Sequence, residues 1–370
     1  MKKKLVIITT VSETLSTILI GQPSWLSKHF QVFCIASLDG VHLVEEDESV
    51  SISYVSMHRG ISPFQDIVSL FKMYVALRRI KPDIVHSYTP KAGFIAMSVA
   101  FFLRVPVRIH TFTGLLFPTA KGIKRKVLYL VDRWVDLLAT HVVPEGKGVK
   151  ADLIGAGVCK KLVDVIGSGN IAGVDLDYFN PALFSRSFFE CADPFTFCYV
   201  GRLHRDKGIK ELVRAFSELE NQARLVLVGG VDDVEPVDSD TLAVISDHPD
   251  IFYIGFKKDI RSVLSSIDVL LLPSYREGFP NVVLQAGAMA KPAIVSNING
   301  CNEVIEHGKN GWLVPPHDAL ALKEAMDEAM SLSQDQIRAM GSTARDKVER
   351  CFARQQYLDS LLRFYEKVLR

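Results

Sequence analysis

Four residues in the second half of the sequence have the chemistry to hold an anionic, hydroxyl-rich ligand. Arg202 offers a planar fork for phosphate oxygens and Lys207 adds a compact positive charge. Gly201, just before them, permits close approach of the backbone to a ligand. Glu277 lies between an apolar run and a helical stretch, and its carboxylate can accept hydrogen bonds from hydroxyl groups. Together these groups suit a sugar attached to a diphosphate.

The residues after Glu277 add backbone groups to this candidate site. We expect a turn into a helix here, formed by Gly278, Phe279, Pro280 and Asn281. Pro280 is near the first helical position, where its missing N–H costs little. Free N–H groups at a helix N-terminus attract phosphate. The candidate site thus consists of two motifs, Gly201–Gly208 and Glu277–Asn281. Either motif alone is as often an ordinary turn with solvated side chains. Their pairing about 70 residues apart favours the ligand-binding interpretation.

Both motifs follow strand-like runs, and such runs alternate with helical stretches throughout the chain. This alternation predicts two parallel α/β domains. The expected strands of the first half are Leu5–Thr9, Val32–Ala36, Ile52–Val55, Ile84–His86, Val107–His110, His141–Val143 and Val163–Ile166. Those of the second half are Phe197–Val200, Leu225–Val228, Phe252–Ile254, Val269–Leu272 and Ala293–Val295. The irregular segment from Gly167 to Ala192 marks the inter-domain connection, so we expect domains at residues 1–180 and 181–370. The second domain should end in amphipathic helices that begin near Ser333.

Ligands of open parallel sheets bind outside the carboxyl ends of the strands. His110 occupies such an end in the first domain, as Arg202 and Glu277 do in the second, so we expect all three to face one cleft. His86 also ends a strand, and it is equally well interpreted as a core histidine or as an acceptor-binding residue. Lys91, near a helix start, is either a solvated side chain or a contact for an acceptor phosphate.

Composition restricts the class of protein. The 370 residues are 48% hydrophobic with a net charge of +1, as in a globular protein with ample core. No apolar run approaches the ~18 residues of a membrane-spanning helix, and the start of the chain indicates a buried strand and not a signal peptide. The six cysteines have no metal-binding spacing and predict reduced thiols in the cytoplasm, without metal or cofactor. No Gly-x-Gly-x-x-Gly follows the first strand, which argues against an oxidoreductase.

Charge is distributed unevenly. Through Ser185 there are 21 Lys and Arg against 15 Asp and Glu, which suggests that the first half faces something anionic. Leu115–Pro118 precedes a basic cluster that is composed of Lys121, Lys124, Arg125 and Lys126. This combination predicts docking on an anionic membrane surface, and not binding of nucleic acid. The alternative is a loop packed on its own domain. Asp175–Asp177 is interpreted as a hinge or capping segment, and Glu45–Glu48 as a solvated loop, and neither is interpreted as a metal site.

Two motifs in the second half carry a resemblance to a known family. Gly201-Arg202-Leu203 with Lys207-Gly208, followed by Glu277–Asn281, resembles the retaining GT-B glycosyltransferases of family four. Three motifs of the first half are similar to the bacterial branch that builds O-antigen, capsule and other glycans on undecaprenyl diphosphate: Val85–Gly93, Ile109–Gly114 and Gly167–Asp175. The resemblance implies a GT-B fold, in which two doubly wound Rossmann-like domains face each other across a cleft.

The resemblance also implies roles for individual residues. Arg202 and Lys207 match the pair that holds the leaving diphosphate, and Glu277 matches the residue that holds the donor sugar hydroxyls. His110 matches a histidine that reaches the donor sugar from the first domain, and the backbone near Phe256 receives the base.

The chain departs from the family at two positions. Gln285 stands where the family has a second glutamate that binds the ribose, and it keeps an acceptor oxygen without the charge. The usual Gly-Gly turn after the first strand is replaced by Thr9–Thr14. Acceptor contacts at that turn are therefore left open.

The function implied is transfer of a hexose or N-acetylhexosamine from a UDP-sugar to an undecaprenyl-diphosphate-linked saccharide at the cytoplasmic face of the plasma membrane. Two other classes remain open. A GT-B nucleotide-sugar epimerase would require further carboxylates in the first domain. A non-catalytic two-domain sugar-binding protein is disfavoured by the paired cations and by the lack of a signal peptide.

Overall fold

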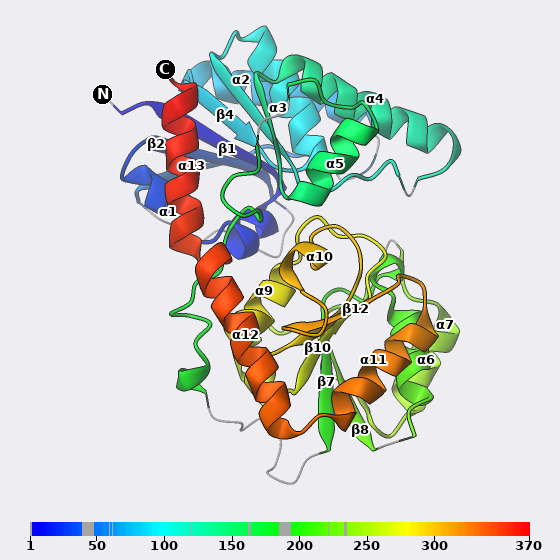
Figure 1. Ribbon diagram of the computed structural model, residues 1–370. Coiled ribbons are helices and arrows are strands. Elements are labelled where there is room, and N and C mark those ends of the chain that lie inside the picture. The colour runs from blue at the N-terminus through cyan, green and yellow to red at the C-terminus, as the bar shows by residue number, and fades with distance from the viewer. Residues whose placement is uncertain are drawn as a thin grey trace. The chain divides into compact units, whose positions relative to one another are not determined.

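The structure, a computed structural model, describes residues 2–38, 48–58, 60, 62–118, 120–161, 164–184, 194–220, 222–232 and 235–370. It divides into two units, of which unit 1 comprises Met1–Gly173 with Gln355–Arg370 and unit 2 comprises Val174–Arg354. Each unit is built on a six-stranded parallel sheet with helices on its faces (Figure 1). The predicted α/β class is therefore confirmed. The predicted acidic segment Glu45–Glu48 lies outside the described residues, apart from Glu48.

The sheet of unit 1 has the strand order β3-β2-β1-β4-β5-β6. Its strands are β1 (Lys4–Val11), β2 (Gln31–Ser37), β3 (Val50–Tyr54), β4 (Ile84–Ser87), β5 (Val107–Phe112) and β6 (His141–Pro144). The seventh strand that the sequence predicted, Val163–Ile166, is wrong over its described residues, which form a loop. A short β-branched run predicts a strand or an extended loop equally well, and here buried Ile166 anchors a loop.

Helices cover both faces of this sheet. On one face lie α2 (Pro63–Ile80), α3 (Pro90–Phe102), α4 (Gly122–Leu138) and α5 (Lys147–Gly155). On the other face lie a short π-helix (Thr14–Ile18), α1 (Gln22–Ser27) and α13 (Arg354–Val368). The sequence placed the terminal helices in the second domain, but α13 packs with unit 1 (Figure 1). Its Tyr357, Leu361 and Tyr365 recur every four residues, so they form one apolar stripe that is buried on the sheet.

The sheet of unit 2 has the order β12-β11-β10-β7-β8-β9. Its strands are β7 (Phe195–Val200), β8 (Ala223–Val228), β9 (Ile251–Tyr253), β10 (Val269–Leu272), β11 (Ala293–Ser296) and β12 (Gly311–Val314). The sequence did not predict β12, because Asn310-Gly311 has the composition of a turn. Gly311 is required there, since a Cβ atom would lie 2.1 Å from the carbonyl oxygen of Ala293.

The helices of unit 2 connect these strands. They are short 3-10 helices at Pro181–Leu183 and Arg205–Lys207, α6 (Ile209–Ser217), α7 (Ser239–Asp247), α8 (Arg261–Ser266), α9 (Asn281–Ala288), α10 (Cys301–Val304), α11 (Ala319–Ser331) and α12 (Gln334–Phe352). Ser333 caps α12 near the predicted helix start, and it forms a capping box in which Gln336 is the reciprocal partner. Among the described residues, no helix is long and apolar enough to cross a membrane.

Candidate active site

The loops that follow β7 and β10 are joined in unit 2. These strands are neighbours, so both loops leave the same edge of the sheet. Asp206, after β7, accepts a hydrogen bond from the backbone N–H of Tyr275 at 2.8 Å and one from Nε of Arg276 at 2.7 Å. Gly208 lies against the second loop so closely that a Cβ atom would be 2.1 Å from the carbonyl oxygen of Pro273. The structure therefore brings the two predicted motifs together.

Lys207 and Glu277 form an ion pair within this joined structure. Nζ of Lys207 lies 2.6 Å from Oε1 of Glu277, and the side chains are 24% and 13% exposed. Both remain accessible to a ligand because neither is fully buried. The sequence predicted the two residues as ligand contacts but did not indicate that they contact each other.

Arg202, which precedes Lys207 on the loop after β7, has its own partner. One guanidinium nitrogen is 2.6 Å from Oδ2 of buried Asp232, while the Arg202 side chain is 60% exposed. Tyr199 holds the start of this loop, since its hydroxyl donates to the Arg202 carbonyl at 2.8 Å. Burial, followed by the Glu277 charge, raises the pKa of Tyr199 well above its usual value, while Arg202 lowers it. Gly201 is required beside it because a Cβ atom would lie 2.7 Å from the Tyr199 hydroxyl.

A third loop, which follows β11, completes this edge of the sheet and was not singled out by the sequence analysis. Gly300 has φ +75°, and a Cβ atom there would lie 2.3 Å from the carbonyl oxygen of Gly278. Burial, followed by the Glu277 charge, raises the pKa of the adjacent Cys301 well above its usual value. The one sequence signal for this loop is the Asn299-Gly300 pair, which is typical of turns that need a positive φ.

The remaining donor-site candidates lie around these loops in different environments. Phe279 packs in the core against Phe352, with ring centroids 5.4 Å apart, so only its backbone can reach a ligand. Pro280 is the N-cap of α9, and Asn281 and Gln285 are partly exposed on that helix. Phe256 follows β9 and is 62% exposed. Their predicted contacts with base and ribose stay predictions.

His110 lies in β5 of unit 1, which continues two residues beyond the predicted end, to Phe112, and its side chain is almost fully buried. Its Nδ1 lies 2.8 Å from the hydroxyl oxygen of Ser87 on the adjacent strand β4. On α3, Gly93 makes room for the imidazole, since a Cβ atom would lie 2.4 Å from Cε1 of His110. Burial lowers the pKa of His110 to about 3, although a hydrogen bond to the Ser87 backbone raises it in part. The imidazole is therefore neutral at physiological pH.

His86 is a core histidine, one of the two alternatives that the sequence left open. Its Nδ1 lies 2.7 Å from the Tyr365 hydroxyl, and its Nε2 lies 2.7 Å from Oγ1 of Thr111. Burial and the neighbouring His110 lower its pKa well below the usual value. Because the side chain has no exposed surface and both nitrogens have partners, this arrangement does not support contact with an acceptor.

Lys91 is also paired in the structure. Its Nζ lies 2.7 Å and 2.8 Å from the two carboxylate oxygens of Asp66, and both side chains are 14% exposed. An acceptor phosphate would have to compete with this carboxylate. The neighbouring N-terminus of α3 is capped from β1, because Oγ1 of Thr10 accepts the backbone N–H of Ala92. This contact occupies the place where the family's Gly-Gly turn was expected.

Three further sequence predictions concerned the loop after β5 and the acidic segments. The loop packs on its own unit, as the alternative held, because Phe117 is buried against Tyr129 with ring centroids 5.5 Å apart. The basic residues that follow it are exposed.

Asp175 is a capping residue, since Oδ1 accepts the N–H groups of Asp177 and Tyr178. In the described part of the chain, no group of His, Cys, Asp or Glu could hold a metal ion.

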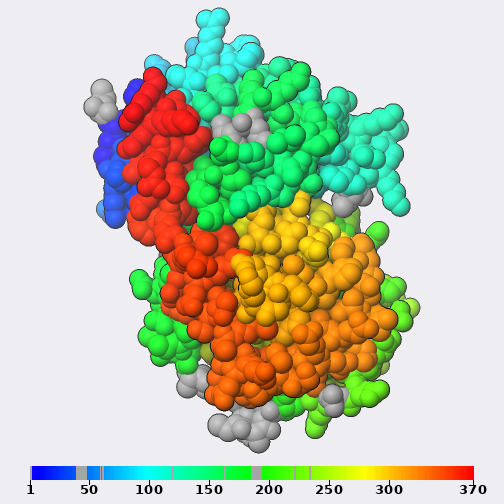
Figure 2. All heavy atoms as spheres, viewed as in Figure 1, coloured from blue at the N-terminus to red at the C-terminus, as the bar shows by residue number. Residues whose placement is uncertain are grey.

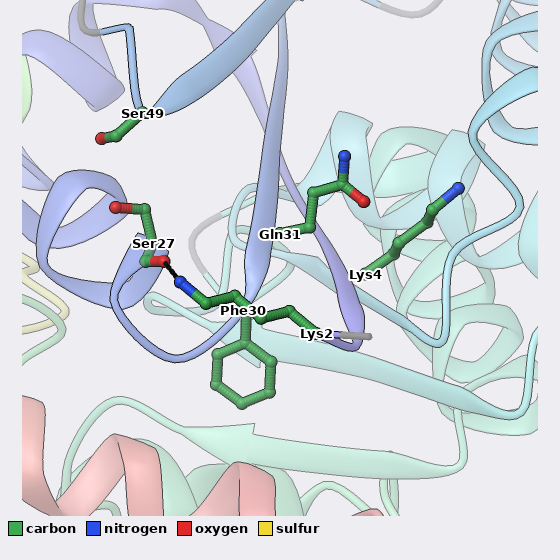
Figure 3. Close-up of a pocket in the computed structure, with 6 residues that line it drawn as sticks. All are labelled: Lys2, Lys4, Ser27, Phe30, Gln31 and Ser49. Atoms are coloured by element: carbon green, nitrogen blue, oxygen red, sulfur yellow. Dashed lines mark hydrogen bonds between the residues drawn. The ribbon is translucent and has the colours of Figure 1, made fainter.

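Unit 1 also has a surface pocket, which is lined by Lys2, Lys4, Ser27, Phe30, Gln31 and Ser49 (Figure 3). It opens at the amino ends of β1 and β2, opposite to the strand end that carries His110. Its two cations are engaged with backbone carbonyls, Lys2 with Ser27 and Lys4 with Ile80. The pocket therefore contributes nothing to the candidate site.

Comparison with known proteins decides the family. The model described as "Glycosyl transferase 4-like domain" matches residues 29–169, and the one described as "Glycosyl transferases group 1" matches residues 194–331. The capsular polysaccharide biosynthesis glycosyltransferase CapM of Staphylococcus aureus is 30% identical over 376 residues, which cover 100% of this chain and 98% of the relative. The chain belongs to this family of glycosyltransferases.

Two further comparisons agree with this assignment. An Escherichia coli UDP-Gal:α-D-GlcNAc-diphosphoundecaprenol α-1,3-galactosyltransferase is 27% identical over 332 residues, which cover 86% of this chain and 84% of the relative. The structure of Anabaena HepE in complex with UDP and glucose has a TM-score of 0.82 at 17% identity and covers 99% of this chain and 100% of that one. The GT-B fold predicted for this glycosyltransferase is thereby confirmed.

Proposed function

We propose that this glycosyltransferase moves a hexosyl or N-acetylhexosaminyl group from a UDP-sugar to a saccharide linked to undecaprenyl diphosphate, with retention of configuration. The observation that carries the proposal is the ion pair between Lys207 and Glu277 where the loops after β7 and β10 meet. One partner suits a phosphate and the other a sugar hydroxyl. The name of the Escherichia coli relative supports the lipid-linked acceptor, and neither of the two relatives is named as an epimerase or a binding protein.

The donor diphosphate would be held by unit 2. Arg202 is exposed enough to turn from Asp232 toward phosphate oxygens, and Lys207 would exchange its contact with Glu277 for one with phosphate. Glu277, freed from the lysine, would then accept hydrogen bonds from the sugar. The N–H groups at the start of α9 add a further favourable field. Such preorganised groups stabilise the charge that grows on a leaving diphosphate, without requiring a metal ion.

Retention would follow from attack on the same face that the diphosphate leaves. The bond between the anomeric carbon and the diphosphate oxygen breaks, and the acceptor oxygen forms the new bond on that face. The acceptor hydroxyl gives its proton to the departing phosphate. His110 is neutral, so its role would be a hydrogen bond to the donor sugar and not acid catalysis.

The acceptor is a lipid, so the protein would act at the cytoplasmic face of the plasma membrane. The first turns of α4 support this location, because Lys121, Lys124, Arg125 and Lys126 are all exposed there. Each basic residue near an anionic surface contributes ~1 kcal/mol. In Figure 2 the blue-green start of α4 lies at the molecular surface.

The proposal is tested first by thermal unfolding of the purified protein with UDP, GDP, ADP and a panel of UDP-sugars. A ligand that binds only the folded state raises Tm. We expect UDP to raise it, and one UDP-sugar to raise it further. Incubation of that sugar with a prenyl-diphosphate-linked saccharide should then give a product with one additional sugar. No shift with any nucleotide, together with no product, would overturn the proposal.

A further inference from the structure

Helix α2 of unit 1 turns an apolar stripe outward. Phe64, Ile67, Phe71 and Val75 follow one another at helical spacing, and they are 80%, 65%, 68% and 51% exposed. Val68, beside them, is 40% exposed. Exposed apolar stripes of this kind mark surfaces that bind a partner or a membrane.

The opposite side of α2 already provides the packing that holds the helix on its unit. Ser69, Met73 and Leu77 are buried at a spacing of four residues, and Leu70 packs partly against the same core. The outward stripe is therefore not needed to fold unit 1. A helix that is apolar on both sides is normally covered on both.

The apolar surface continues from α2 onto α3 and α4. The ring of Tyr74 on α2 meets that of Phe102 on α3 edge to face, with centroids 6.0 Å apart, and Phe102 is 75% exposed. On α4, the indole N–H of Trp134 donates to the hydroxyl of Ser98 on α3 at 3.0 Å. Leu130 of α4 is 64% exposed. The three helices thus form one layer whose outer side carries large apolar groups.

The charges on this layer are almost all positive. Lys72, Arg78 and Arg79 of α2 are exposed, and the basic cluster Lys121–Lys126 begins α4. The sole acidic residue of α2, Asp66, is neutralised by Lys91. Cations beside apolar groups, without exposed acids on α2, match an anionic bilayer better than the mixed charges of a typical protein surface.

We propose that the outward stripe of α2, defined by Phe64, Ile67, Val68, Phe71 and Val75, inserts between the headgroups and acyl chains of an anionic bilayer. The flanking cations of α2 and the basic start of α4 contact the lipid phosphates. This proposal rests on the proposed function in one respect, which is that the acceptor lipid would lie in the same bilayer. Binding is then partly apolar, so it should survive salt that screens the charges.

Flotation of the full chain with vesicles tests the insertion. We expect wild type to bind vesicles that contain phosphatidylglycerol more tightly than vesicles of phosphatidylcholine, and to retain part of that binding at ~1 M salt. The double substitution Phe64→Ser with Phe71→Ser should lower the partition coefficient about tenfold or more. The control substitution Leu320→Ser removes a side chain that is 61% exposed in unit 2, and it should leave binding unchanged.

Other outcomes would overturn the inference. They are absence of wild-type binding to either kind of vesicle, or unchanged binding by the double variant. If wild type is a dimer that does not bind vesicles, and the double variant is a monomer, the stripe is instead an interface between copies of this chain. Light scattering on the same samples separates this case.

Activity separates failure of this inference from failure of the proposed function. Phe64→Ser with Phe71→Ser should keep wild-type transfer to a short-chain, water-soluble prenyl-diphosphate saccharide and lose transfer to the same saccharide on undecaprenyl diphosphate in vesicles. Equal loss on both acceptors would overturn the membrane role. Absence of transfer by wild type on both acceptors, with intact vesicle binding, would contradict the proposed function alone.

Discussion

The ammonium of Lys207 and the carboxylate of Glu277 lie 2.6 Å apart, although 70 residues separate them in the sequence. The contact joins the loop after β7 to the loop after β10. A donor that carries both a diphosphate and a sugar would divide these partners between its two parts.

Replacement of Glu277 by Gln should reduce kcat by about a hundredfold or more, since a neutral amide cannot replace the charge that we propose to contact the donor sugar. The fold should be unaffected because Glu277 lies on a loop. Steady-state kinetics and Tm measure the two effects. Glu324→Gln, at an exposed position of α11, is the matched control. Near-normal activity of the Glu277 variant would remove this residue from the site.

Replacement of Arg202 by Ala should weaken UDP binding, because a charged contact to phosphate is lost. We expect a tenfold to hundredfold rise in Kd, about 1.4–3 kcal/mol. Titration calorimetry measures it. Arg214→Ala removes an arginine whose side chain is 71% exposed on α6 and should leave Kd unchanged. Equal affinity of the Arg202 variant and wild type would refute the phosphate role.

Replacement of Gly93 by Ala should displace the imidazole of His110, because the new Cβ atom would lie 2.4 Å from Cε1. Overpacking of this kind costs roughly 1–3 kcal/mol of unfolding free energy. We also expect lower kcat with an unchanged Kd for UDP, since the diphosphate contacts are proposed for unit 2. Gly155→Ala is the control, because its added Cβ atom meets no neighbour within 4 Å. Wild-type kcat in the Gly93 variant would show that the position of His110 does not matter.

The unfolding free energy should fall as pH decreases from about 6.5 toward 4. The folded-state pKa of His110 is about 3, below its usual value of 6.5. In this window the unfolded chain binds a proton that the folded chain does not, so acid favours unfolding by up to about 1.4 kcal/mol per pH unit. The lowered pKa of His86 acts in the same direction.

Asp132 opposes this trend and provides an internal control. Burial raises its pKa from 3.8 to about 7, so between these values the folded chain holds the extra proton and acid favours folding. Denaturant titrations at several pH values should show a shallower acid dependence for His110→Asn and a steeper one for Asp132→Asn. If unfolding free energy depended on pH identically in both variants and wild type, the pKa shifts assigned to His110 and Asp132 would be contradicted.

The direction of the strands and the order of the motifs were determined by the sequence alone. Apolar runs that alternate with helical stretches require parallel strands, and parallel strands place the residues that follow them at one edge of a sheet. That reasoning located Arg202, Lys207 and Glu277 in unit 2 and His110 in unit 1 before any contact was known. The strand that it missed, β12, begins at Gly311, and Gly311 with the preceding Asn310 has the composition of a turn.

Only the tertiary structure decided which of these groups meet and which are covered. The pairing of Lys207 with Glu277, the fit of His110 against Gly93 and the burial of His86 under Tyr365 depend on distances between segments far apart in the chain. Helix α2 shows the reason most clearly, because apolar residues occupy both of its sides. Periodicity cannot tell which side faces the sheet, and only packing placed Met73 inside and Phe71 outside.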